Sequence, residues 1–149
     1  MHKLILLVLC FGVLPGCFHD DESIDNTAEA EKYSRNLQIW LDANITDYQF
    51  TYHESCFCMP QEDLIIQVQN STVASAFYAQ SGEYVANDQL GSVPAIDDLF
   101  AVIKDALDRN AYEINSTYHA DYGFPQHIYI DYLKNAVDEE FGFTVSDFQ

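Results

Sequence analysis

The sequence predicts an α+β domain in which an antiparallel sheet carries two helices on one face. Apolar residues recur at helical spacing near residues 27–44 and 94–107, and alternating apolar and polar residues follow each of these stretches. The order of elements is therefore helix, three strands, helix, three strands. Strands grouped in runs between helices favour an antiparallel sheet, because a parallel sheet alternates strand with helix.

The first helix is expected from about Thr27 to Asn44. Asn26 and Glu29 have the spacing of a capping box at its start. Its core-facing stripe consists of Tyr33, Leu37, Trp40 and Leu41.

The first three strands are expected at residues 48–58, 64–69 and 73–78. The first has aromatic residues on one face and ends before Pro60, which cannot continue a central strand. Asn70-Ser71 is predicted to form the turn between the second and third strands. Those aromatic residues are Tyr48, Phe50 and Tyr52.

The second helix is expected to begin near Pro94 or Ala95. Asp97 and Asp98 lie in its first turn, where carboxylates stabilise the helix dipole, and we interpret them in that way rather than as a catalytic pair. Three further strands are predicted at residues 111–118, 128–132 and 141–145.

The first residues of the chain have the pattern of an export signal. Leu4 to Val13 is apolar but shorter than the roughly 20 residues that a spanning helix needs. Leu14-Pro15-Gly16-Cys17 follows and resembles the bacterial lipoprotein signal, in which the cysteine thiol is acylated before cleavage. Ordinary secretion with a cut nearby is the alternative. We therefore predict a signal peptide at 1–16, a lipidated Cys17 with an acidic tether at 17–26, and one domain at 27–149.

The charge of the chain restricts its partners. After removal of Lys3 with the signal, 24 acidic residues remain against five basic ones, a net charge of about −19. Such a surface argues against nucleic acid and against direct docking on anionic lipid, so the membrane is expected to be contacted through the lipid anchor only. An acidic surface also keeps a protein soluble through self-repulsion, which is the simplest interpretation.

Cys56 and Cys58 are the two cysteines expected in the mature domain. Exported cysteines usually oxidise, but two residues of an extended strand place their Cα atoms about 6.6 Å apart, at the outer limit for a disulfide. We expect a local disulfide with a bend in the strand. Reduced thiols, an intermolecular bridge, thiol redox exchange and metal binding remain alternatives.

Two metal sites are consistent with the residue types. His53, Cys56, Cys58 and Met59 offer a soft ligand set for Cu(I) or Zn²⁺, although His53 is predicted on the strand face opposite the cysteines. Oxygen ligands in the 131–140 loop could hold Ca²⁺, without the spacing of an EF-hand, and a solvated hairpin is the simpler interpretation. These candidate ligands are Asp131, Asp138 and Glu139, with Asn135 and Glu140 beside them.

Several short segments, taken together in their order and spacing, resemble the bacterial family called domain of unknown function six-one-seven-four. They are Tyr48-Gln-Phe-Thr-Tyr52, Cys56-Phe-Cys58, Ile96-Asp-Asp-Leu-Phe100, Tyr122-Gly-Phe-Pro125, Ile128-Tyr-Ile-Asp131, Asp138-Glu-Glu140 and Phe143-Thr-Val-Ser146. The resemblance covers about residues 40–148. It implies small secreted or lipid-anchored bacterial proteins and no assigned activity, and His53 and Met59 lie outside its pattern.

The sequence lacks the common nucleophile, nucleotide and zincin motifs. We therefore expect a lipid-anchored cell-envelope protein with a non-catalytic binding or structural domain, an envelope partner and no cofactor. If the cell has two membranes, Phe18 after the lipidated cysteine favours the outer one. A metal-binding or thiol-redox accessory protein that uses the cysteine pair is the alternative.

Overall fold

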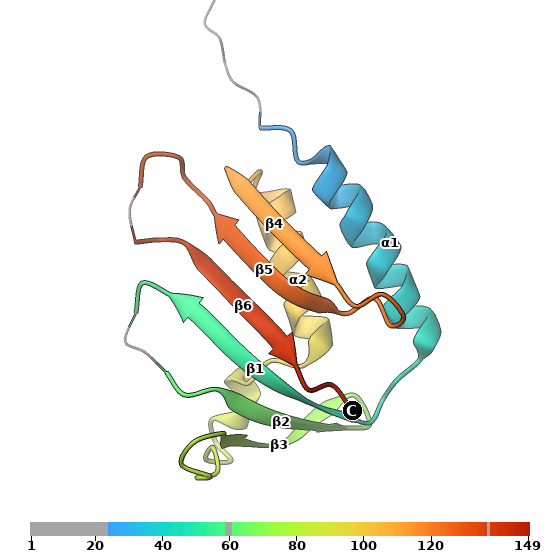
Figure 1. The fold of residues 1–149 in the computed structure, drawn as a ribbon, viewed down its shortest axis with the longest axis vertical. Coiled ribbons are helices and arrows are strands. Elements are labelled where there is room, and N and C mark those ends of the chain that lie inside the picture. The colour runs from blue at the N-terminus through green and yellow to red at the C-terminus, as the bar shows by residue number, and fades with distance from the viewer. Residues whose placement is uncertain (1–23, 59–60, 137) are drawn as a thin grey trace, which may run out of the picture.

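The computed structural model describes residues 24–149 except 59, 60 and 137. Two α-helices and six strands follow one another in the predicted order, with one short 3-10 helix before the second α-helix (Figure 1). The α+β prediction is confirmed. The elements are α1 Thr27–Ala43, β1 Tyr48–Cys56, β2 Leu64–Gln69, β3 Thr72–Tyr78, η1 Leu90–Ser92, α2 Ile96–Asp108, β4 Glu113–Tyr118, β5 Pro125–Asp131 and β6 Phe141–Ser146.

The six strands form one antiparallel sheet in the order β3-β2-β1-β6-β5-β4. Each half of the chain contributes three neighbouring strands, and the halves join through β1 and β6 at the centre (Figure 1). Tyr52 lies opposite Val145 in this central pair. The first and last strands of the domain are therefore hydrogen-bonded to each other, which ties the two halves into one unit.

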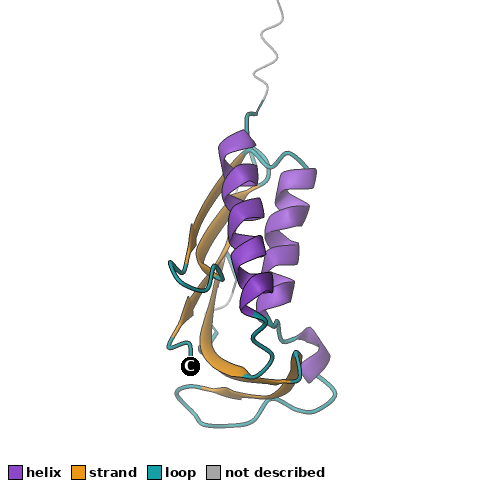
Figure 2. Ribbon diagram, turned by 90° about the vertical axis from the view of Figure 1, so that its right-hand side faces the viewer, coloured by secondary structure: helices purple, strands orange, loops and turns teal. Residues whose placement is uncertain are grey.

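Both α-helices cover the same face of the sheet, as Figure 2 shows. Helix α1 contacts β4, α2 contacts β5, and η1 lies against β3. Alternate residues of the strands point into this layer and form the core, because successive side chains of a strand face opposite ways. The fully buried members on the strands include Phe50, Ile66, Ile128, Ile130 and Phe143.

The hairpin between β2 and β3 has the turn that its sequence predicts. Asn70 and Ser71 both have positive φ, 49° and 59°, and they connect the paired residues Gln69 and Thr72. Two residues of positive φ match the right-handed twist of the flanking strands, and Asn adopts this conformation more readily than most residues.

The expected capping box at the start of α1 is wrong. The Asn26 side chain does not cap the helix and instead donates to the carbonyl of Ala111, 3.0 Å away. Glu29 turns toward Lys32 and Ser116. The side chains of Asn26 and Glu29 therefore bond to Ala111 and Ser116 in the β4 region instead of to each other's backbone. These bonds satisfy the two side chains and also hold α1 against the sheet.

The apolar stripe of α1 is narrower than expected. Tyr33 and Leu37 pack against the core and Trp40 is buried, but Leu41 is 56% exposed. One residue further along a helix turns the side chain by about 100°, which takes Leu41 off the face that Trp40 occupies.

The fourth strand begins at Glu113, two residues later than predicted. The amide of Ala111 bonds to the carbonyl of Ala106 and closes the end of α2, so Ala111 is buried without joining the sheet. Tyr132 lies beyond β5, where its ring stacks under Arg109.

The first turn of α2 uses its aspartates structurally. Asp98 accepts a hydrogen bond from the amide of Ala95, and Asp97 accepts one from the indole of Trp40, both at 2.8 Å. The hydroxyl of Tyr48 accepts the amide of Ile96. The bonds to Asp98 and Tyr48 satisfy free amide groups at the start of the helix, and the bond to Asp97 satisfies the indole N–H of Trp40, so the two aspartates have structural partners.

Candidate functional site

The candidate site lies at the end of β1, where a carboxylate and two cysteines are close together. Residues Tyr52, Glu54 and Cys56 share the helix-side face of the strand, because they are two positions apart. Tyr52 is buried, Cys56 is half-buried and Glu54 is exposed. The strand ends at Cys56 and the chain bends through Phe57 and Cys58.

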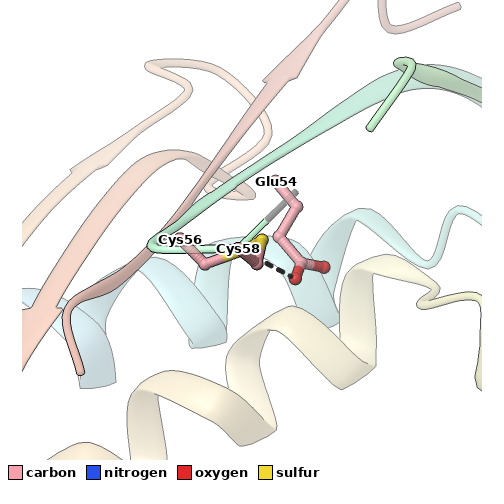
Figure 3. Close-up of side chains that lie close together, drawn as sticks. All are labelled: Glu54, Cys56 and Cys58. Carbon is pink, nitrogen blue, oxygen red and sulfur yellow. Dashed lines mark hydrogen bonds between the residues drawn. A yellow bond between two sulfur atoms is a disulfide. The ribbon is translucent and has the colours of Figure 1, made fainter. Parts of the chain in front are cut away.

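Cys56 and Cys58 lie at disulfide-bonding distance, and the structure joins their sulfur atoms (Figure 3). Their Cα atoms are 5.2 Å apart, well below the separation of an extended strand and inside the usual disulfide range. The bend after β1 produces this shortening. Cys58 is exposed, so the sulfur pair is accessible from solvent.

Glu54 connects this sulfur pair with Tyr52. Its Oε2 accepts the hydroxyl of Tyr52 at 3.2 Å, and its Oε1 lies 3.8 Å from Cys56 Sγ (Figure 3). One ligand-type atom from each of Glu54, Cys56 and Cys58 lies within 4.8 Å of the others. Sequence reasoning missed Glu54, for which the local sequence holds no signal of its own.

A pocket of about 250 Å³ opens beside Glu54 on the helix side of the sheet. Its floor comes from β1, β2 and β3, and the chain between Val85 and Pro94 forms the opposite wall. Glu54 is the one charged side chain among the described residues that line it. The lining is Tyr52, Glu54, Gln61, Leu64, Tyr78, Val85, Gln89, Ser92, Val93 and Pro94.

Tyr52 stays protonated at this position. Burial raises the pKa of its hydroxyl well above the usual value, and the neighbouring charge and hydrogen bond of Glu54 act in the same direction. A protonated tyrosine donates to the carboxylate, which holds one oxygen of Glu54 in place. The second oxygen faces the sulfur pair.

The soft-metal ligand set predicted from the sequence is not brought together as a whole. His53 is exposed, and its Nδ1 lies 2.6 Å from Asp63 rather than beside the cysteines. Strand alternation places it on the opposite face of the sheet from Cys56. Met59 lies outside the described residues.

The calcium candidates do not converge either. Asp131 ends β5, and its side chain accepts the amide of Leu133. In the part of the chain that the structure describes, Glu54, Cys56 and Cys58 make the one close group of three ligand-type side chains. Asp131, Asp138 and Glu139 do not form a second one, and Asp138 has a positive φ of 71° within its loop.

A buried polar cluster joins α1 to β4. Ser116 is 5% exposed, and its hydroxyl donates to Glu29, which also binds Lys32. The Lys32 ammonium reaches the Ser116 carbonyl as well. A serine, a carboxylate and a lysine in contact resemble a nucleophile with its base, but α1 lies over this hydroxyl. The cluster satisfies the buried polar groups that docking of α1 requires.

The geometry defines a two-layer α+β domain with a small acidic pocket beside a pair of neighbouring cysteines. The family of unknown function DUF6174 matches residues 32–149, and the chain belongs to this family. No curated protein and no solved structure matches the chain. Among the described helices, none has the length and apolar content needed to cross a bilayer. Cys17 lies outside the described residues.

Proposed function

We propose that this protein is a lipid-anchored protein of the cell envelope whose domain binds a partner and does not catalyse a reaction. The observation that carries the anchor is Leu14-Pro15-Gly16-Cys17 directly after the apolar run of residues 4–13. The first helix begins at Thr27, ten residues after Cys17, so a short acidic tether would connect the lipid to the domain. In a cell with two membranes, Phe18 favours the outer one.

Labelled fatty acid tests the anchor in cells. We expect acyl label on the natural chain and on a Ser23→Ala control, and none on Cys17→Ser. Multiple acyl chains hold a protein on a membrane far more firmly than one chain does. A Cys17→Ser chain that still carries the label would contradict the anchor.

The binding role is supported by a difference between Glu54 and the polar side chains that hold the fold together. Asp97, Ser116 and Glu29 each make a bond between elements of the fold, and Asp98 caps its own helix. Glu54 is different, because it faces an open pocket. Affinity capture from native envelope with the domain should recover a partner, whereas turnover by the purified protein in a broad hydrolase screen would overturn the non-catalytic role.

A second candidate function is a metal-binding or thiol-redox accessory protein. The observation that favours it is the approach of Glu54 to Cys56 and Cys58 within 4.8 Å. A cysteine ligates Zn²⁺ or Cu(I) as its thiolate and not as a disulfide, so the pair would have to be reduced first. Mass spectrometry of exported protein decides between the candidates: two free thiols or a retained metal favour this function, and an intact disulfide that mild reductant leaves unchanged excludes it.

A further inference from the structure

The charge of the chain is unevenly distributed. Residues 36–103 contain nine acidic side chains and no Lys or Arg. This stretch includes β1, β2, β3 and η1, and therefore all of the walls of the pocket beside Glu54. Three ion pairs of Lys and Arg lie on α1 or at the C-terminal end of α2, with Lys32, Lys104 and Arg109 as the cations.

The pocket has the features of a site for one cationic group. The Glu54 carboxylate stands at its edge and is held by the Tyr52 hydroxyl. Tyr52 and Tyr78 line the pocket, and an aromatic face attracts a cation. Leu64 and Val93 offer apolar surface that an aliphatic stem would cover. The carboxylate gives the charge, and the rings and apolar side chains give the shape.

The volume restricts the occupant further. At about 250 Å³ the pocket is smaller than the roughly 300–1,000 Å³ of typical sites for cofactors and drug-sized ligands. It suits a group with the size of one long side chain. A bare divalent ion would want more than one carboxylate, and Glu54 is the one that lines the pocket.

We propose that this pocket binds an aliphatic ammonium group, with Glu54 as its charge partner and Tyr52 and Tyr78 as aromatic walls. The inference rests on the binding role proposed above and names the chemistry of the ligand. It does not depend on the lipid anchor. A lysine side chain of a protein and a free polyamine carry the same group, and the experiment separates these two sources.

The test is a methyl NMR titration of the full chain in a non-ionic detergent. Leu64, Val85 and Val93 line the pocket and serve as reporters. The probes are N-acetyl-lysine methylamide, spermidine and the uncharged N-acetyl-norleucine methylamide. We expect saturable shifts of the reporter methyl groups with the first two probes and none with the third. Tighter binding of the lysine probe would assign a protein partner, and tighter binding of spermidine would assign a polyamine.

Two matched variants distinguish binding at the pocket from a diffuse attraction of cations by the acidic surface. Glu54→Gln removes the charge at the pocket and keeps the shape, whereas Glu83→Gln removes one charge from the same acidic half, outside the pocket lining. A hydrogen bond between two ionised groups is stronger than one to a neutral amide, so Glu54→Gln should weaken binding at least about tenfold. Glu83→Gln should change it less than about twofold, because Glu83 does not line the pocket and its exposed charge acts on the ligand only through solvent.

Circular dichroism confirms that each variant is folded. Equal weakening by the two substitutions would show diffuse attraction of cations and overturn the proposal. Reporter shifts that are absent with both charged probes, or equal for the uncharged one, would overturn it as well. A partner captured from envelope that does not compete with either amine would contradict the pocket while leaving the binding role intact.

Discussion

The indole Nε1 of Trp40 on α1 donates a hydrogen bond to the carboxylate of Asp97 on α2 at 2.8 Å. Trp40 is 4% exposed, and its ring packs edge-on against Tyr48 and Phe124. The bond therefore joins the two helices at a point where the indole contacts the first strand and the β4–β5 turn. A buried indole N–H needs a partner, and Asp97 is the one it has.

Asp97→Ala should destabilise the domain by about 1–3 kcal/mol, the cost of leaving a buried donor without a partner. Asp108→Ala on the same helix is the control. Asp108 pairs with Lys104 in an exposed ion pair, and its loss should cost less than about 1 kcal/mol. Urea unfolding followed by tryptophan fluorescence measures both, and equal losses would show that the Trp40 bond adds nothing.

Gly123→Ala should be among the most destabilising single-methyl changes. Gly123 has a φ of +72°, and a Cβ there would lie 2.4 Å from the carbonyl oxygen of Asn36 and 2.9 Å from Ile39 Cβ. The β4–β5 turn that contains Gly123 packs closely against α1, so the added methyl group would force the backbone of the turn or of the helix to shift. We expect a loss of about 2–5 kcal/mol from the conformation and the overlap together.

Gly82→Ala is the matched control for that variant. Its φ is +70°, and nothing lies within 4 Å of a Cβ built there. The left-handed conformation alone should cost about 1–2 kcal/mol. Thermal unfolding of the two variants separates conformation from contact, and similar melting temperatures would contradict the close approach to α1.

Alkaline pH should unfold the domain through its buried tyrosines. Burial raises the pKa of Tyr48 from 10.0 to about 12, and the charges of Asp97 and Asp98 act in the same direction. The unfolded chain then loses this proton before the folded chain does. The contribution of protonated Tyr48 to the free energy of unfolding is fully present below pH 10.0 and is lost as the pH rises toward 12.

Tyr48→Phe should flatten part of this pH dependence. Part should remain, because burial also raises the pKa of Tyr118 to about 12. The urea midpoint at about pH 8 and about pH 11 gives the measurement. An unchanged slope in the variant would show that Tyr48 titrates like a tyrosine in water.

Loss of the Cys56–Cys58 link should have a small effect on stability. The two residues enclose a single residue, so the bond closes a very short loop and removes little entropy from the unfolded chain. The double variant Cys56→Ser, Cys58→Ser should lose at most about 2 kcal/mol. A domain that fails to fold without the link would contradict this, as judged by circular dichroism.

The sequence predicted the fold well where periodicity decides it. Phe50, Ile66 and Val145 are buried in strands as their alternation indicates, and Asn70-Ser71 forms the turn. Predictions failed where a distant partner decides. Asn26 and Glu29 have capping-box spacing, yet their side chains bond to Ala111 and Ser116, which no local pattern reveals.

The candidate site was predicted only in part. Two cysteines in an exported chain indicated a disulfide, and the Cα separation now fits one. Glu54 was missed because a single carboxylate in a strand has no signature of its own. Glu54 becomes a candidate binding residue only because the segment between Val85 and Pro94, far from it in sequence, forms the opposite wall of a pocket.

We propose that lipid on Cys17 holds the domain at a membrane. Mass spectrometry of the N-terminal peptide from the mature protein is the direct test of this claim. We predict a peptide that begins at residue 17 and carries the added mass of a diacylglyceryl group and its acyl chains. A peptide that begins at another residue, or begins at residue 17 with an unmodified thiol, would contradict the claim.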